Sequence, residues 1–187
     1  MNERGYLYLL IGGAMLASPT LLFIPGDVAG FGWIPIFMGI RSMQTSPREV
    51  QNALYFAIFG MFISWSLRLG VEIVPEFFIQ NQLVPLLSIL REFFTVGVFF
   101  WLLKAEYMWS PNQQKRIEWM GFSAIGLVYF LMMAVFIFAG QGIPMEIVLF
   151  TLRIFRPLSL VYYGVLVFIF AKLYLESRNG SGLRRWK

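Results

Sequence analysis

The chain of 187 residues contains no cysteine and no histidine. Without cysteine there can be no disulfide, no thiol nucleophile and no thiolate metal site. Without histidine the commonest haem and zinc ligand and the usual general base are also missing. These two absences exclude a haem b subunit, a zinc protease and any hydrolase that depends on a Ser-His or Cys-His pair.

Charge is also scarce, because only 13% of the residues are Asp, Glu, Lys or Arg, whereas 58% are hydrophobic. A soluble domain is nearer to about 45–50% apolar and about 25% charged. One soluble core of this size could not bury so much apolar surface. The composition therefore predicts an all-α, polytopic transmembrane helix bundle in the cell membrane, with residues 1–187 forming a single membrane domain.

Metal chemistry has little support in the sequence. Asp27 is the only aspartate, which disfavours the Asp-rich metal motifs of lipid phosphotransferases, and no group of Glu residues has the spacing of a metal site. We therefore expect no metal site and no cofactor.

Apolar runs predict about six membrane spans. The runs cover residues 6–24, 28–40, 52–71, 84–103, 120–139 and 158–175. A span needs about 20 residues, and the run 28–40 is short and interrupted by Gly30, Pro35 and Gly39. If that segment is re-entrant and does not cross, five spans remain. The last element is predicted to start near Pro144 and to run to about Glu176, with a kink at Pro157. Its first part, residues 145–156, is expected to be interfacial, and residues 158–175 are expected to span.

The positions of Lys and Arg predict the orientation. These residues occur in the loops 41–51 and 104–119 and after residue 171, whereas the loop 72–82 has none. Because basic loops stay in the cytoplasm, the C-terminus is predicted to be cytoplasmic, and six spans put the N-terminus there as well. Five spans would put it outside. Residues 178–187 are predicted to form a basic cytoplasmic tail that contacts anionic lipid, so the net charge of +5 does not indicate nucleic-acid binding.

Two hairpins, residues 51–107 and 117–176, resemble each other faintly. The segments 91–106 and 156–176 each have an Arg, a mid-span Gly and then a Lys and a Glu. Parallel repeats of this kind occur in transporters. The alternative is that Arg and Lys bracket any span, so a weak internal duplication is one of two interpretations.

Charged side chains inside the apolar runs are the main functional signal. Such charges are costly and usually face the bundle interior or a water-filled cavity. They lie on three stripes of helical period. The first stripe holds Ser64, Arg68 and Glu72, the second Ser88, Arg91, Glu92 and Thr95, and the third Glu146, Arg153 and Arg156. If the stripes faced one another, with Arg91 and Arg153 at a similar depth, they would line a polar chamber opening outward. The predicted ligand-binding residues are Arg68, Glu72, Ser88, Arg91, Glu92, Thr95, Glu146, Arg153 and Arg156.

Each stripe also has a structural interpretation. Arg68 and Glu72 could form an ordinary ion pair at the outer rim, and the stripe around Arg153 could be the polar face of an interfacial helix. Because arginines and acids are balanced, the whole set could neutralise itself as a structural network. It could equally bind a zwitterion or a small anion, since the arginine fork matches carboxylate and phosphate.

The sequence therefore favours a small membrane protein that binds a polar or anionic small molecule, or a lipid headgroup, for transport or sensing. The alternative is a non-catalytic accessory or scaffold subunit of a larger membrane complex. A lipid-modifying enzyme with Glu92 or Glu72 as base is the weakest option, because no activated nucleophile accompanies them. We therefore expect no enzyme activity. The expected partners are membrane lipids and a partner membrane subunit or a second copy. The small residues Gly13 and Ala17 permit either close helix approach within the chain or such an interface.

Overall fold

The computed structural model describes residues 3–21, 30–42, 48–81, 83–108, 113–139 and 145–178. Within these ranges the secondary structure is entirely α-helical, as the composition predicts. The helices are α1 (Glu3–Leu21), α3 (Trp33–Arg41), α4 (Arg48–Ile73), α5 (Pro75–Gln80), α6 (Leu83–Met108), α7 (Gln113–Ala139) and α8 (Met145–Arg178).

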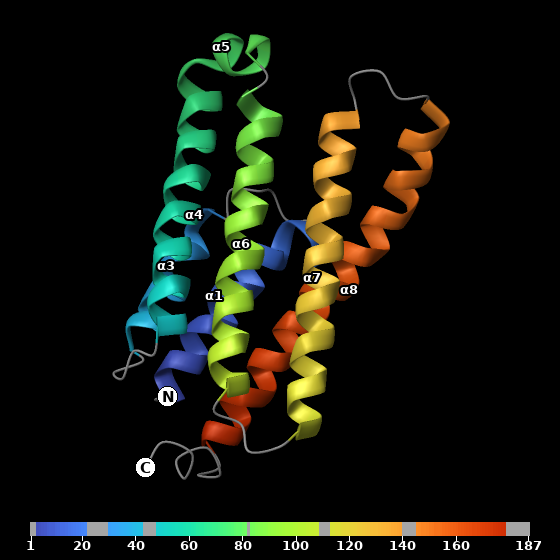
Figure 1. Ribbon diagram of the computed structural model, residues 1–187. Coiled ribbons are helices and arrows are strands. Elements are labelled where there is room, and N and C mark those ends of the chain that lie inside the picture. Colours follow the sequence, from blue (N-terminus) through green and yellow to red (C-terminus); the bar gives the residue numbers. More distant parts are fainter. Residues whose placement is uncertain are drawn as a thin grey trace.

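Six of these helices pack as a closed ring. Contacts run from α4 to α6, α7, α8, α1 and α3, and from α3 back to α4. Along this ring α4 and α7 run upward in Figure 1, and α6 and α8 run downward. The shorter helices α1 and α3 form an antiparallel pair beside the lower half of α4, so the start of α1 and the end of α8 lie at the same end of the bundle.

Three helical segments in the described part of the chain are long and apolar enough to cross a membrane: Arg48–Ile73, Leu86–Glu106 and Pro157–Arg178. They indicate a multi-pass membrane protein. Helices α4 and α6 have 26 residues each, which makes each about 39 Å long, against about 30 Å for a bilayer core. By contrast, α3 has nine residues, or about 14 Å. The interrupted run 28–40 thus contains a helix too short to cross a bilayer core.

Helix α8 corresponds to the predicted last element, which was expected to run from near Pro144 to about Glu176. Its 34 residues form one helix that continues through Pro157, and Figure 1 shows it inclined along its whole length. Residues 145–156 are the first part of this helix, as predicted, and their position at the membrane interface stays a prediction. The predicted duplication would relate the pair α4 and α6 to the pair α7 and α8, and it stays a prediction.

Small residues allow the helices to approach closely. A Cβ atom on Gly60 of α4 would lie 2.3 Å from Cη2 of Trp33 in α3, so only glycine fits there. Gly13 faces the side chain of Leu166 in α8, and Ala17 is fully buried in the core. Of the two uses predicted for Gly13 and Ala17, the structure shows close helix approach within the chain.

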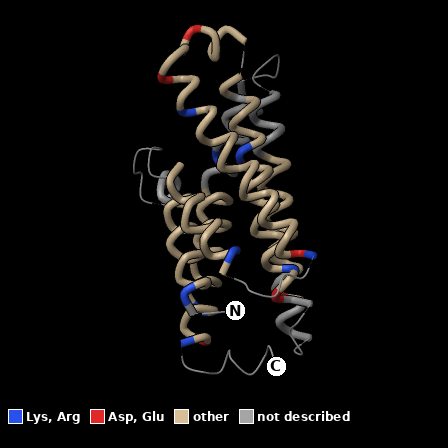
Figure 2. Tube along the Cα trace, turned by 90° about the vertical axis from the view of Figure 1, so that its left-hand side faces the viewer, with Lys and Arg blue, Asp and Glu red and all other residues tan. Residues whose placement is uncertain are grey.

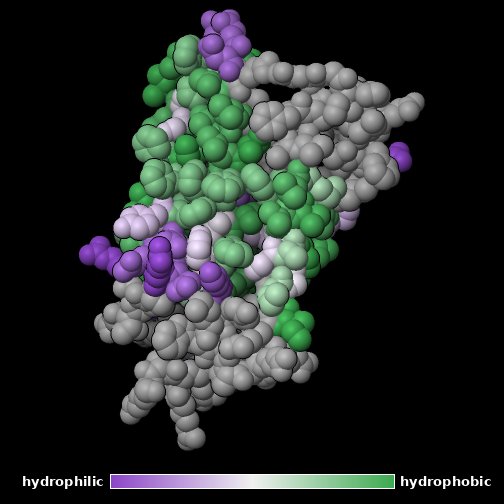
Figure 3. Space-filling model, viewed as in Figure 1, coloured by the Kyte–Doolittle hydropathy of each residue, from purple (hydrophilic) through white to green (hydrophobic). Residues whose placement is uncertain are grey.

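The outer surface is largely apolar. In Figure 3 hydrophobic side chains cover the face in view between hydrophilic patches at the top and at the lower left. Tyr55, Phe59 and Phe62 on α4 are 59%, 55% and 66% exposed, as suits side chains in contact with lipid. Figure 2 shows Lys and Arg near the lower end, a smaller basic group in the upper half, and acidic residues at the upper tip.

Candidate functional site

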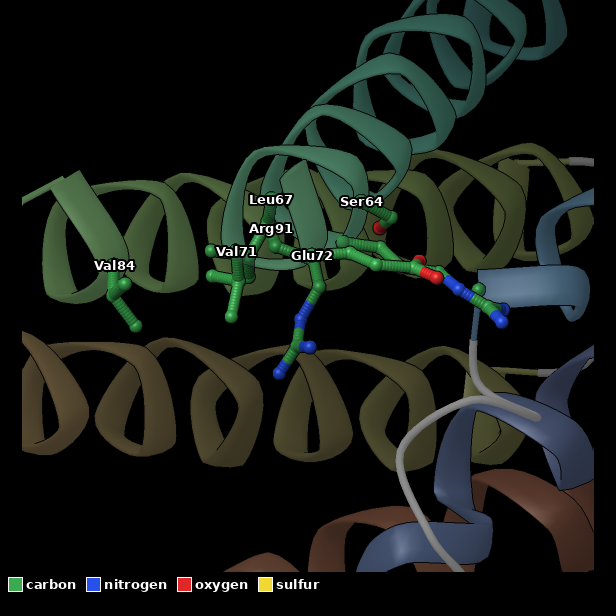
Figure 4. Close-up of a pocket in the computed structure, with 8 residues that line it drawn as sticks. Ser64, Leu67, Val71, Glu72, Val84 and Arg91 are labelled. Carbon is green, nitrogen blue, oxygen red and sulfur yellow. The ribbon is translucent and has the colours of Figure 1, made fainter. Parts of the chain in front are cut away.

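A pocket of about 480 Å³ lies between the upper halves of α4 and α6 (Figure 4). Its polar and charged side chains come from these two helices. Gly30, which lies three residues before the start of α3, also borders it. Apolar side chains from both helices complete the wall. The described lining residues are Gly30, Ser64, Leu67, Arg68, Val71, Glu72, Val84 and Arg91.

The period of the α-helix explains which side chains of α4 reach the pocket. Ser64, Arg68 and Glu72 are four residues apart and therefore share one helix face. Arg91 of α6 faces the same space because α6 packs antiparallel against α4. The structure thus brings Arg91 of α6, which the sequence placed on a separate stripe, together with Ser64, Arg68 and Glu72 of α4.

Arg68 has a buried donor without a hydrogen-bond partner. Its Nη1 atom is buried and has no hydrogen-bond partner in the described part of the chain. The guanidinium carbon lies 5.5 Å from the ring centre of Phe31 and 5.6 Å from that of Trp65. These rings stabilise the cation through its face and do not satisfy the N–H donors at its edge. The predicted ion pair between Arg68 and Glu72 does not form between these two described residues.

Arg91 is paired. Its Nη2 atom donates to Oε1 of Glu92 at 3.1 Å, and its side chain remains 33% exposed, whereas that of Glu92 is 8% exposed. A guanidinium has five N–H donors, so this single bond leaves others available on the pocket side. The Thr95 hydroxyl donates to the backbone carbonyl of Arg91 at 2.8 Å, which explains why Thr95 is buried without lining the pocket.

Glu92 lies in a closed cluster on the other side of α6. The Tyr163 hydroxyl of α8 donates to Oε2 of Glu92 at 2.7 Å, and the Tyr129 hydroxyl of α7 donates to the same atom at 3.3 Å. Neighbouring helix residues point about 100° apart, so Arg91 and Glu92 face different helices. The carboxylate therefore has three donors, one each from α6, α7 and α8.

An aromatic stack supports this cluster. Tyr162 lies between Phe122 and Tyr129, with ring centres 5.2 Å and 5.1 Å apart and interplanar angles of 8° and 10°. The stack can form because Gly126 leaves room, since a Cβ atom there would lie 2.9 Å from Cε2 of Tyr162. The rings of α7 and α8 are thus held against each other beside Glu92.

Of the residues predicted to line a chamber between α6 and α8, the described Arg153 does not share a pocket with Arg91. Arg153 is exposed and does not line the pocket. Tyr163 of α8 lies at the depth of Glu92, and Arg153 is ten residues earlier, or about 15 Å nearer the upper end along the helix. Arg91 therefore shares its pocket with Arg68 instead. Ser88 is half-buried and lies outside the lining. The Glu146 and Arg156 side chains lie outside the described residues.

Several contacts of the site were not predicted from the sequence. Trp33 donates to the Ser64 hydroxyl at 2.7 Å, and Tyr129 donates to Glu92. A tyrosine in the middle of an apolar run was the available signal, because a buried phenol usually needs a hydrogen-bond partner. The described residues contain no group of three or more His, Cys, Asp or Glu arranged to hold a metal ion.

Comparison of the chain with protein-family models, curated proteins and solved structures found no match. The chemistry of the pocket and of the Glu92 cluster is therefore the basis for a functional proposal.

Proposed function

We propose that this multi-pass membrane protein binds the negatively charged group of a small solute or a lipid headgroup in the pocket between α4 and α6. The observation that carries the proposal is the buried Nη1 atom of Arg68, which has no hydrogen-bond partner among the described residues. Glu92 compensates Arg91 and is not bonded to Arg68. A buried guanidinium N–H without an acceptor is costly, and the oxygen of a bound anion would remove that cost.

The surroundings of Arg68 support a ligand with an oxyanion. The aromatic rings contact the face of the guanidinium, so the N–H groups at its edge are the free donors. Carboxylate, phosphate and sulfonate oxygens match such donors. Leu67, Val71 and Val84 supply apolar contacts for the carbon part of the ligand. Transport or sensing would follow from this binding step.

The proposal includes no catalytic step. Ser64 is the one hydroxyl in the described lining of the pocket, and it accepts a hydrogen bond from Trp33. None of the other described lining residues is a base positioned to activate it, since Glu72 lies two turns away on the same helix. Glu92 is already held by three donors.

We further propose that the lower end of the bundle lies in the cytoplasm. Arg41, Arg48 and Lys104 lie at helix ends on that side, whereas Glu72 and Glu76 lie at the upper end. The positive-inside rule then puts the pocket in the outer half of the membrane. The direction of α1 supports a cytoplasmic N-terminus, as in the six-span topology, although α3 is too short to span. Helices α4, α6, α7 and α8 would then be the full crossings.

Cysteine labelling tests this orientation without background, because the natural chain has no cysteine. Gln80→Cys in α5 should react with an impermeant thiol reagent in intact cells, and Gln51→Cys near the start of α4 should react only after lysis. Both positions are exposed. The opposite pattern would reverse the orientation.

Arg68→Gln tests the binding proposal. We would measure binding of ethanesulfonate by calorimetry and of phosphatidylethanol by native mass spectrometry, both in an uncharged detergent. These probes represent a free anion and an anionic lipid. Loss of one charge-assisted hydrogen bond should weaken binding of whichever probe the protein takes by about 10-fold or more. The melting temperature should not fall, because the variant removes a side chain whose buried donor has no partner among the described residues.

Arg153→Gln is the matched control, since this arginine is exposed and does not line the pocket. It should leave binding unchanged. Equal binding by wild type and Arg68→Gln, or a lower melting temperature for Arg68→Gln without any probe binding to the wild type, would contradict the proposal.

The alternative function, an accessory or scaffold subunit, is favoured by the same unpartnered cation. An acidic side chain of a neighbouring subunit could neutralise Arg68 as a ligand would. Native mass spectrometry after mild extraction separates the two functions. A hetero-oligomer that Arg68→Gln dissociates would support the subunit function, whereas a single protein with a small molecule or lipid attached would support binding.

A further inference from the structure

The charges that line the pocket are ordered by depth. Arg68 lies five residues before the end of α4, and Glu72 lies one turn above it, or about 6 Å nearer the upper end. Glu72 is exposed, and it does not pair with Arg68 although the spacing of four residues would allow a pair. Figure 4 shows Glu72 and Arg91 bordering the same pocket. The backbone of Glu72 therefore lies nearer the upper rim than that of Arg68, and charges of both signs line the pocket.

We propose that the ligand of this pocket is a zwitterion, whose oxyanion lies against Arg68 and Arg91 and whose ammonium group lies against Glu72. The inference rests on the proposed function and names its ligand class. The chemistry is that of an ammonium joined by a short carbon linker to a sulfonate, carboxylate or phosphodiester. A free solute or the headgroup of a lipid can present it.

The charge balance of the described site favours this class over a simple anion. Arg68 and Arg91 are matched in number by Glu72 and Glu92, so a ligand without net charge leaves the net charge of the site unchanged. A simple anion would add a negative charge and would also be repelled by Glu72. A zwitterion turns that repulsion into attraction while its oxyanion still satisfies Arg68.

Glu76 of α5 provides a matched control. It carries the same charge at the same end of the bundle, is exposed, and is not among the described lining residues. A general effect of negative charge at the upper surface would be the same for Glu72 and Glu76, whereas direct contact with an ammonium group requires Glu72.

The experiment compares two pairs of probes that differ only in the ammonium group. Taurine is compared with ethanesulfonate for the free ligand, and phosphatidylethanolamine with phosphatidylethanol for the lipid. Affinities are measured in an uncharged detergent for the wild type, Glu72→Gln and Glu76→Gln. The wild type should prefer the ammonium-bearing probe of at least one pair by about threefold, the value of one exposed ion pair. Glu72→Gln should lose that preference, and Glu76→Gln should keep it.

The pair that shows the preference identifies the source as a free solute or a lipid. Equal binding of both members of each pair to the wild type would overturn the zwitterion inference and leave the anion site intact, as would a preference that survives in Glu72→Gln. If no probe of either pair binds the wild type, the proposed function fails together with the inference.

Discussion

Arg91 and Glu92 are neighbours in the sequence, but they face two regions of the molecule that differ in how completely their charged groups are hydrogen-bonded. On one side of α6 the Glu92 carboxylate is almost fully buried and accepts hydrogen bonds from Arg91, Tyr129 and Tyr163. On the other side the pocket holds Arg68, whose Nη1 atom has no hydrogen-bond partner among the described residues. In the first region the carboxylate has three hydrogen-bond donors, whereas in the second the Nη1 donor of Arg68 has no acceptor among the described residues.

This difference separates stability from binding. A satisfied polar cluster that links three helices contributes to the fold, and removing one member leaves the others buried without partners. An unsatisfied cation in an open pocket contributes little to the fold and is available to a ligand. Variants of the Glu92 cluster should therefore change the melting temperature, and variants of the pocket should change binding.

Glu92→Gln should give the largest loss of stability. It leaves the Arg91 cation without its counterion, and we expect a loss of about 3 kcal/mol, the low end for removing one partner of a buried pair, because Arg91 is 33% exposed. Thermal unfolding followed by tryptophan fluorescence in detergent measures the effect, with Arg68→Gln as the pocket variant for comparison. If both variants melted at the wild-type temperature, the two regions would not differ as argued.

Gly60→Ala should have the next largest effect. A Cβ atom there would lie 2.3 Å from the Trp33 ring, and forcing a methyl group into a packed contact costs about 1–3 kcal/mol. Movement of Trp33 would also disturb its hydrogen bond to Ser64 in the pocket. Gly121→Ala is the control, since nothing lies within 4 Å of the added Cβ atom. A melting temperature as high for Gly60→Ala as for Gly121→Ala would show that α3 and α4 can move apart freely.

Tyr163→Phe should lower the free energy of unfolding by less, about 1.5 kcal/mol, because it removes one hydrogen bond to a charged acceptor. Tyr129→Phe should cost less again, because its hydroxyl lies 3.3 Å from Oε2 of Glu92, whereas that of Tyr163 lies 2.7 Å away. Parallel urea or thermal unfolding of the two variants gives the ranking. The reverse order would mean that Tyr129 is the principal donor to Glu92.

The apolar runs of the sequence determined the helices. The runs 52–71, 84–103 and 120–139 lie within α4, α6 and α7, because a chain in lipid must satisfy its backbone hydrogen bonds internally and does so as a helix of bilayer length. The interrupted run 28–40 left a sixth span and a re-entrant segment both open, and only the structure showed that α3 is too short to cross. The spacing of Ser64, Arg68 and Glu72 determined that they share one face, since the helical period is independent of what the helix packs against.

Only the tertiary structure decided which faces meet. Arg91 shares a pocket with Arg68 and not with Arg153, and Glu92 meets Tyr129 and Tyr163, which the spacing of charges alone did not indicate. The partners depend on how the helices pack and on their relative depth, and these follow from close contacts such as Gly60 with Trp33 and Gly126 with Tyr162. Such contacts are steric fits between residues far apart in the chain, and the periodicity of a single helix carries no information about them.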